Sequence, residues 1–164
     1  MTRLAALTFA HCSDASAAAS EGEGGATAAI SNTMTRVIRV VQLGTARVSS
    51  EGPRLGTVRR LPRAVRKTDF AHRNFFDAWL PELAPSAPLI AWALSRPFTD
   101  RRWATFARKY RAEMRKPSAQ RLIALLAVLS RRANFSVGCY CHNETRCHRI
   151  LLKELLIAHG ATVT

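Results

Sequence analysis

The chain has 164 residues, 48% of which are hydrophobic, and its formal net charge is +14 at pH 7. This length suits one domain with a hydrophobic core of its own. The longest apolar run, residues 122–129, is much shorter than the roughly 18 to 20 residues that a membrane-spanning helix needs. No membrane-spanning segment is therefore expected, and no membrane partner.

The first 33 residues differ in composition from the rest of the chain. Residues 13–33 are almost entirely Ala, Ser, Gly, Glu and Thr, which bury too little apolar surface to offset chain entropy, so we expect residues 1–33 to be disordered. Polar residues interrupt the short Ala/Leu stretch before them, which does not suit a signal peptide. We predict that the biological start is Met34 and that residues 34–164 form a single α/β domain; a genuine flexible tail is the alternative.

The predicted domain is strongly basic. Residues 34–164 contain 24 Lys and Arg against 8 Asp and Glu. Such a charge favours phosphate-bearing ligands or polyanions, so nucleic acid is one candidate partner. Most of the basic residues are Arg, however, and a GC-rich genome produces that bias without selection for binding. Four cysteines without an export signal indicate a reducing, cytoplasmic compartment, where such clusters bind metal or react more often than they form disulfides.

The predicted elements begin with two strands. Residues 35–43 are rich in β-branched side chains and predict a strand that ends at Gly44. A turn leads into a second short strand over residues 54–62, and a basic loop over residues 59–67 follows.

Helical patterns dominate the middle of the chain. Aromatic and apolar spacing predicts a short helix between Asp69 and Leu83. Ser86 is a predicted N-cap, and an amphipathic helix begins near Thr99. Residues 117–132 predict a mostly buried helix. Four aromatic residues at helix-core spacing are expected to serve packing: Trp79, Trp92, Trp103 and Tyr110.

The chain ends with a predicted strand over residues 134–141 and a helix from about Cys147 to His159, which Gly160 closes. The order of the elements predicts an α/β fold. We expect a single three-layer domain with a small, mostly parallel sheet, a helix-rich middle and a C-terminal strand-loop-helix.

The segment SVGCYCHNETRCHR carries the most reactive side chains. Cys139 and Cys141 stand at the end of the last strand, and Cys147, His148 and Arg149 begin the last helix. Open α/β sheets bind ligands at the carboxyl ends of their strands. A helix N-terminus favours anions and lowers the pKa of a thiol. The pattern therefore indicates a binding or reactive site.

Metal binding is one hypothesis for this segment. Cys139, Cys141 and Cys147, with His142 or His148, would supply the ligands of a Cys₃His zinc site. The two cysteines of the strand share one face, which permits this arrangement. The spacing is not one of the common zinc-finger spacings.

Thiol catalysis is a second hypothesis. Cys147 would be the nucleophile, His148 or Glu144 would transfer protons, and Arg149 would hold an anionic substrate. Neither cysteine of the strand is followed by Arg six positions later, which disfavours a phosphatase-type loop. A redox pair within C-x-C, and ordinary packing with the helix start capped by its own polar side chains, also stay open.

The basic loop over residues 59–67 follows a strand, as the cysteine segment does. The two segments are therefore expected to face one pocket at the same edge of the sheet, which makes an anion-binding site more plausible than either segment does alone.

Four segments of the chain resemble successive blocks of the proteins grouped as domain of unknown function 488. The resemblance covers about Arg36 to Ala161. It implies a three-layer α/β domain, a CHR turn that opens the last helix, and a domain start near the first strand. The segments are GPRLGTVRRLPRAVRKTDF, FDAWLPELAPS, WATFARKYRAEM and LLAVLSRRANFSVGCYCHNETRCHRILLKELL.

No established reaction accompanies this resemblance. It singles out Arg60, Pro62 and Arg63 in the basic turn. In the C-terminal loop, it singles out Cys141, Glu144, Cys147, His148 and Arg149.

The chain departs from the family pattern at two positions. Relatives carry Gly where this chain has Ala64, so we expect a glycine backbone conformation to be absent and the turn to differ. Relatives tend to have an acidic residue where this chain has His142, and the change slightly favours a metal.

We therefore predict an anion-binding pocket, and we favour the hypothesis that the chain is an enzyme that acts on a phosphorylated or otherwise anionic substrate. A nucleic-acid-binding module and a non-catalytic structural zinc domain are the alternatives. The candidate anion-binding residues are Arg60, Arg63 and Arg149, and the candidate catalytic residues are Cys147, His148 and Glu144. The candidate zinc ligands are Cys139, Cys141, Cys147 and His142.

Overall fold

Four strands form one parallel sheet in this computed structural model, which describes residues 36–164. The strands are β1 (Ile38–Gln42), β2 (Arg54–Gly56), β3 (Ala78–Trp79) and β4 (Phe135–Cys139), in the order β1-β4-β2-β3. Every residue of the central strand β4 is buried, as expected for a parallel strand covered on both faces. The predictions for residues 1–33 and for a start at Met34 lie outside the described residues.

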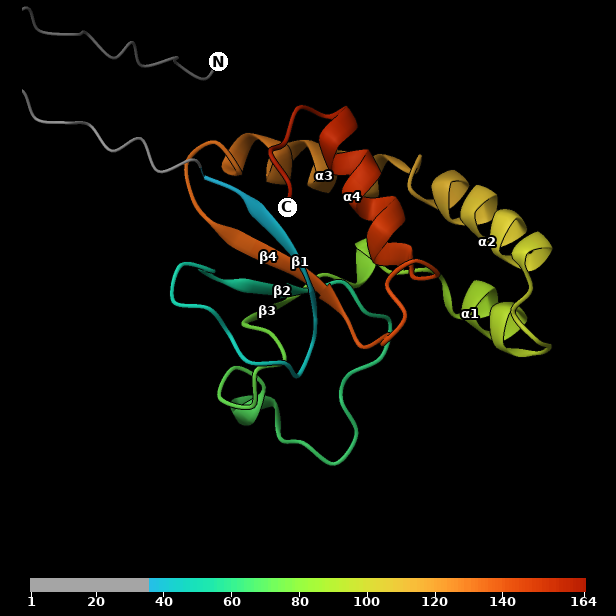
Figure 1. Ribbon diagram of the computed structural model, residues 1–164, viewed down its shortest axis with the longest axis horizontal. Coiled ribbons are helices and arrows are strands. Elements are labelled where there is room, and N and C mark those ends of the chain that lie inside the picture. Colours follow the sequence, from blue (N-terminus) through green and yellow to red (C-terminus); the bar gives the residue numbers. More distant parts are fainter. Residues whose placement is uncertain (1–35) are drawn as a thin grey trace, which may run out of the picture. The chain divides into compact units, whose positions relative to one another are not determined.

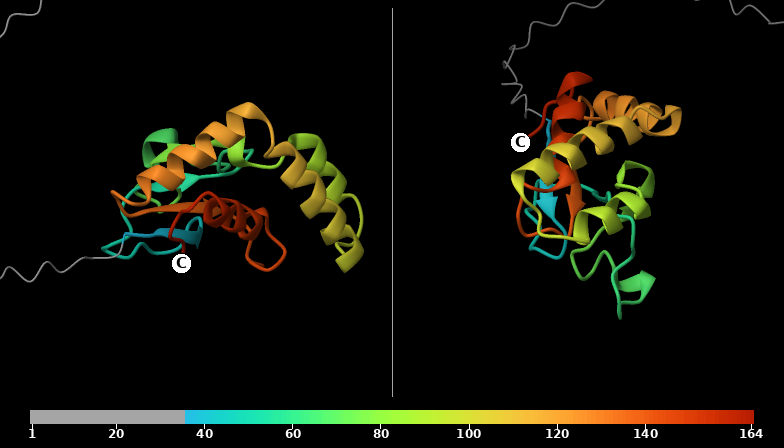
Figure 2. Two further views of the ribbon diagram at one scale, coloured as in Figure 1. Left: turned by 90° about the horizontal axis from the view of Figure 1, so that it is seen from above. Right: turned by 90° about the vertical axis from the view of Figure 1, so that its right-hand side faces the viewer.

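Of the four α-helices in the described residues, the last two along the chain lie over the sheet, and the first two extend away from it (Figure 1). The four helices are α1 (Ala87–Leu94), α2 (Asp100–Glu113), α3 (Pro117–Leu129) and α4 (His148–Ala158). The predicted N-caps are confirmed, because the Ser86 and Thr99 hydroxyls accept hydrogen bonds from the backbone N–H groups of Leu89 and Arg102. Figure 2 shows α1 and α2 side by side, extending away from the strands.

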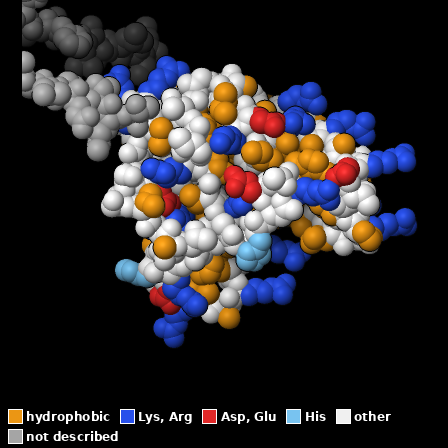
Figure 3. All heavy atoms as spheres, viewed as in Figure 1, with side chains coloured by type: hydrophobic (Ala, Val, Ile, Leu, Met, Phe, Trp, Pro, Cys, Tyr) orange, Lys and Arg blue, Asp and Glu red, His pale blue; other side chains and the backbone are white. Residues whose placement is uncertain are grey.

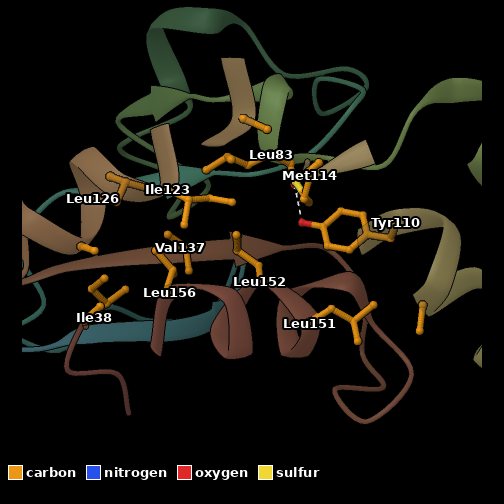
Figure 4. Close-up of a cluster of buried hydrophobic side chains, with 14 of the residues drawn as sticks. Ile38, Leu83, Tyr110, Met114, Ile123, Leu126, Val137, Leu151, Leu152 and Leu156 are labelled. Atoms are coloured by element: carbon orange, nitrogen blue, oxygen red, sulfur yellow. Dashed lines mark hydrogen bonds between the residues drawn. The ribbon is translucent and has the colours of Figure 1, made fainter. Parts of the chain in front are cut away.

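The main hydrophobic core lies between the sheet and these helices (Figure 4). Alternate residues of β1 and β4, such as Ile38 and Val137, point into it because side chains alternate along a strand. The Tyr110 hydroxyl donates a hydrogen bond to the Leu83 carbonyl at 2.8 Å, which satisfies a buried polar group. The largest fully buried side chains of this core are Ile38, Leu83, Tyr110, Met114, Ile123, Val137, Leu152 and Leu156.

Loops cover the opposite face of the sheet. A second cluster, which includes Leu43, Phe70 and Phe76, packs there and at the carboxyl end of β4. A Cβ atom on Gly56 would lie 2.4 Å from the Phe76 ring, so the absence of a side chain allows this loop to pack closely on the sheet. The α/β class with a small parallel sheet is confirmed, and its third layer consists of loop and 3-10 segments.

The prediction of a helix between Asp69 and Leu83 is wrong. This stretch contains the 3-10 turns Lys67–Asp69 and Pro81–Leu83, with the short strand β3 between them. β3 pairs with β2, a contact between distant residues that local helical spacing does not reveal. Trp79 is 42% exposed and does not pack in a helix core; its indole N–H donates to the Val58 carbonyl.

Within the described residues, no helix is long and apolar enough to cross a membrane.

The backbone at Ala64 corrects another expectation. Its φ is +57°, so the turn retains the left-handed conformation for which glycine is best suited. The expected loss of this conformation is therefore wrong, and the Cβ atom of Ala64 occupies a strained position.

We predict that Ala64→Gly raises the free energy of unfolding by about 1 kcal/mol, because it removes the clash of a Cβ atom in a left-handed residue. The same change at Ala112, an exposed position inside α2, should lower the free energy of unfolding by about 0.5–1 kcal/mol. Urea titrations of both variants measure the two effects. A loss of stability in Ala64→Gly would contradict the left-handed backbone at residue 64.

Candidate functional site

Three thiols meet at the carboxyl end of β4. Cys139 is the last residue of the strand, Cys141 follows two residues later, and Cys147 directly precedes α4. Their Sγ atoms all lie within 4.8 Å of one another, and the Cys139 and Cys141 Sγ atoms are 3.5 Å apart. All three are free thiols; Cys139 and Cys147 are buried, whereas Cys141 is exposed.

His142 is placed apart from this group. Its Nδ1 atom lies 3.0 Å from the amide Nε2 atom of Gln42, on the exposed surface. In the part of the chain that the structure describes, the group able to hold a metal ion consists of the three cysteines alone. The structure therefore brings together three of the four predicted zinc ligands.

His148 is the first residue of α4 and is buried. Its Nε2 atom lies 2.7 Å from the Thr57 carbonyl oxygen, so this nitrogen carries the proton and donates it in a hydrogen bond. Its Nδ1 atom lies 3.8 Å from the Cys147 sulfur. Burial lowers the pKa of His148 to about 4, so the imidazole is neutral at pH 7 and can accept a hydrogen bond from the Cys147 thiol.

Arg149 places a positive charge beneath the loop. Its side chain is 4% exposed, and its Nη2 atom lies 4.0 Å from a carboxylate oxygen of Glu144, which is 52% exposed. The buried Nε and Nη1 atoms of Arg149 have no hydrogen-bond partner among the described residues. A buried guanidinium without partners is costly, so its surroundings favour an anion.

The three thiols differ in acidity. Hydrogen bonds from Cys139 and Cys147 hold the pKa of Cys141 well below its ordinary value, and the positive charge of Arg149 acts in the same direction. The hydrogen bond to Cys141 raises the pKa of Cys139 to about 11. Hydrogen bonds to the other two thiols raise the pKa of Cys147 as well. The first proton to leave the group therefore comes from Cys141.

A cavity of about 430 Å³ opens beside the three thiols. His148 and Tyr140 line it, as do Arg59, Arg60 and Arg146. Arg149 is buried and does not line the cavity. The remaining lining residues are apolar: Val58, Pro85, Ile90, Ala93, Leu94, Phe98 and Phe106.

The predicted basic residues have different positions relative to this cavity. Arg60 is exposed and lines it, whereas Arg63 is exposed but lies outside the lining. Basic side chains are spread widely over the face of the molecule drawn in Figure 3. This distribution does not separate nucleic acid from small anions as partners, so the nucleic-acid alternative stays a prediction.

Two features of the cavity escaped the sequence analysis. One is its apolar wall from α1 and Phe98, since these residues reach the cysteines only through tertiary packing. The other is Arg146, which forms an ion pair with Asp100 and donates to the Phe98 carbonyl at 2.7 Å. In the sequence, the one signal for a role of Arg146 at this site is its position directly before the CHR turn.

One protein-family model matches most of the described chain. The model of the family DUF488-N3a, described as the active DUF488-N3 subclade, matches residues 38–160. The chain belongs to this family, which confirms the resemblance to domain of unknown function 488. No curated protein and no solved structure matches the chain.

We predict that Cys141 reacts with iodoacetamide at a rate that changes little between about pH 6 and pH 9. Its lowered pKa keeps the thiolate populated across this range, whereas Cys139, with its raised pKa, should react slowly throughout. Mass spectrometry after timed alkylation measures each site, and Cys141→Ser should lose the fast phase. A rate at Cys141 that climbs steadily towards pH 9, as for an ordinary thiol, would sink this prediction.

Proposed function

We propose that this chain is an enzyme that acts on an anionic substrate through the thiolate of Cys141. One observation carries the proposal: an exposed thiol with two thiol neighbours within 4.8 Å lies at a cavity lined by arginines. A thiolate is the nucleophilic form of cysteine, and donors that stabilise it make it available at neutral pH.

The geometry favours Cys141 over Cys147 as the reactive group. Cys147 is 2% exposed, and both neighbouring thiols raise its pKa, so it retains its proton. In this role Cys147 donates a hydrogen bond and does not attack the substrate. His148 is neutral, and its Nε2–H group donates to the Thr57 carbonyl, so it does not act as an acid.

Three groups favour an anionic substrate. Arg60 lines the cavity, and the buried guanidinium of Arg149 lies near Cys141, whose pKa it lowers. The N-terminus of α4 adds the positive end of a helix dipole directly after Cys147. Together these charges favour a phosphate, sulfate or carboxylate close to the thiolate.

The simplest reaction that the site supports is a nucleophilic displacement followed by hydrolysis. The Cys141 sulfur forms a bond to the electrophilic atom, and the bond to the leaving group breaks with its electron pair. The leaving group takes a proton from water at the open side of the loop. A second water then adds its hydroxyl to the transferred group, releases a proton and restores the thiolate. Glu144, at the surface of the loop, is the candidate acceptor for that proton.

Phosphate protection tests the anion site. Inorganic phosphate should slow the alkylation of Cys141 by iodoacetamide in the wild-type protein, because the anion occupies the space next to the thiolate. Arg60→Ala should raise the phosphate concentration needed for half protection at least threefold. Arg63→Ala is the matched control and should leave it unchanged, since Arg63 does not line the cavity. No protection in the wild-type protein, or equal effects of the two variants, would rule out the proposed anion site.

A second candidate function is a metal-dependent one. Three thiolates at a tetrahedral zinc ion, with Zn–S distances of about 2.3 Å, lie about 3.8 Å from one another. The Sγ atoms observed here lie within 4.8 Å and need little movement to reach this geometry. A fourth position would open to the cavity, as in catalytic zinc sites. Zinc content near one per chain, with thiols masked until chelation, would favour this candidate over a free thiolate.

A further inference from the structure

We infer that the substrate of this site is amphipathic: an anionic group lies beside Arg60 and Cys141, and an apolar body, aromatic or aliphatic, lies against α1. This inference rests on the proposed function and names its substrate class. The inference rests on one arrangement: thiols and arginines line one edge of the cavity, and an apolar wall lines the other.

The apolar wall comes mainly from α1 and the segment after it. Ile90, Ala93 and Leu94 of α1 line the cavity, and Phe98 and Phe106 continue the surface. Leu94 is 80% exposed, which makes it the most exposed large apolar side chain of the described residues. When a ligand covers this exposed apolar surface, water is excluded from it and the free energy of the complex is lowered.

Arginines supply the positive charge at the other edge of the cavity, beside the thiolate proposed for Cys141. No carboxylate lines this cavity within the described residues, whereas three arginines do. Arg59 and Arg146 already donate to the backbone carbonyls of residues 84, 85 and 98. Arg60 has no hydrogen bond or ion pair from its side chain in the described residues and is free to contact an anion. The charge of the ligand is therefore negative, and its charged group lies at the Arg60 side.

The volume of the cavity excludes a bare inorganic anion as the full occupant. At about 430 Å³, it falls in the range of cavities that hold organic ligands. A phosphate or sulfate ion would fill only the part next to the thiolate and leave the apolar wall in contact with water. A phenyl-sized or larger body fills the remainder.

Two arginines fix the distance between the polar edge and the apolar wall. Arg146 of the cysteine loop donates to the Phe98 carbonyl, between α1 and α2, and pairs with Asp100, the first residue of α2. Arg59 is tied to the carbonyls of Ala84 and Pro85, just before α1. The cavity is therefore largely preformed, which lowers the entropic cost of binding.

Calorimetry with phenyl phosphate and inorganic phosphate tests this inference. Phenyl phosphate should bind the wild-type protein at least tenfold more tightly than phosphate, because the ring covers the apolar wall. Leu94→Ser and Ile90→Ser should each lower the affinity for phenyl phosphate at least threefold and leave the affinity for inorganic phosphate unchanged. Leu125→Ser is the matched control, because Leu125 is a half-exposed helix leucine outside the cavity. This variant should change the affinity for neither ligand.

Equal affinities for phenyl phosphate and phosphate would overturn the inference while leaving the anion site intact. Tight phenyl phosphate binding that neither cavity variant weakens would also overturn it, because the ring would then lie elsewhere. Benzyl alcohol separates a failure of the proposed function from a failure of the inference. If benzyl alcohol binds as tightly as phenyl phosphate and phosphate does not bind, the apolar wall is real but the anion site is not.

Discussion

The hydrogen bonds that hold the end of β4 between its two neighbours are the constraint on which the site depends. The Gly138 carbonyl accepts from both the backbone N–H and the hydroxyl of Thr57, and the Cys139 carbonyl accepts from the Leu43 N–H at 2.9 Å. A Cβ atom on Gly138 would lie 2.4 Å from the Leu43 side chain, so a larger residue here would force Leu43 to move. Because Thr57 also accepts from His148, the same few bonds fix the start of α4 relative to the strand. The three thiols meet as a consequence.

A buried ion pair fixes the other end of the same strand. Arg54 donates to both carboxylate oxygens of Glu51 at 2.6 and 2.8 Å, and the Ser136 hydroxyl donates to the same carboxylate. Burial alone would raise the pKa of Glu51, but these hydrogen bonds outweigh it, and the pKa lies below its ordinary value. The pair is fully satisfied, which is the condition under which buried charges persist in a protein interior. Two polar networks therefore set the register of β4, one at each end.

Local patterns predicted the elements that depend on local residues. The caps at Ser86 and Thr99, the amphipathic α2 and the strand-loop-helix around the cysteines follow from spacing and turn chemistry. Local patterns did not predict the structure between Asp69 and Leu83. The spacing of the apolar residues in this region is typical of a helix, whereas β3 forms because it pairs with β2. The same division holds for the site. The cysteines are close in sequence, whereas the apolar wall and the pairing of Arg146 with Asp100 join residues that only the fold brings together.

The proposed function depends on Cys141 being a stabilised thiolate in a positively charged environment. The most direct test compares two alkylating reagents of nearly equal size at this residue, neutral iodoacetamide and anionic iodoacetate, with glutathione as the reference thiol. We predict that the ratio of the iodoacetate rate to the iodoacetamide rate is higher at Cys141 than at glutathione, and that added salt reduces the difference. A ratio at Cys141 equal to or below that of glutathione would show that no cationic site surrounds the thiol and would contradict the account.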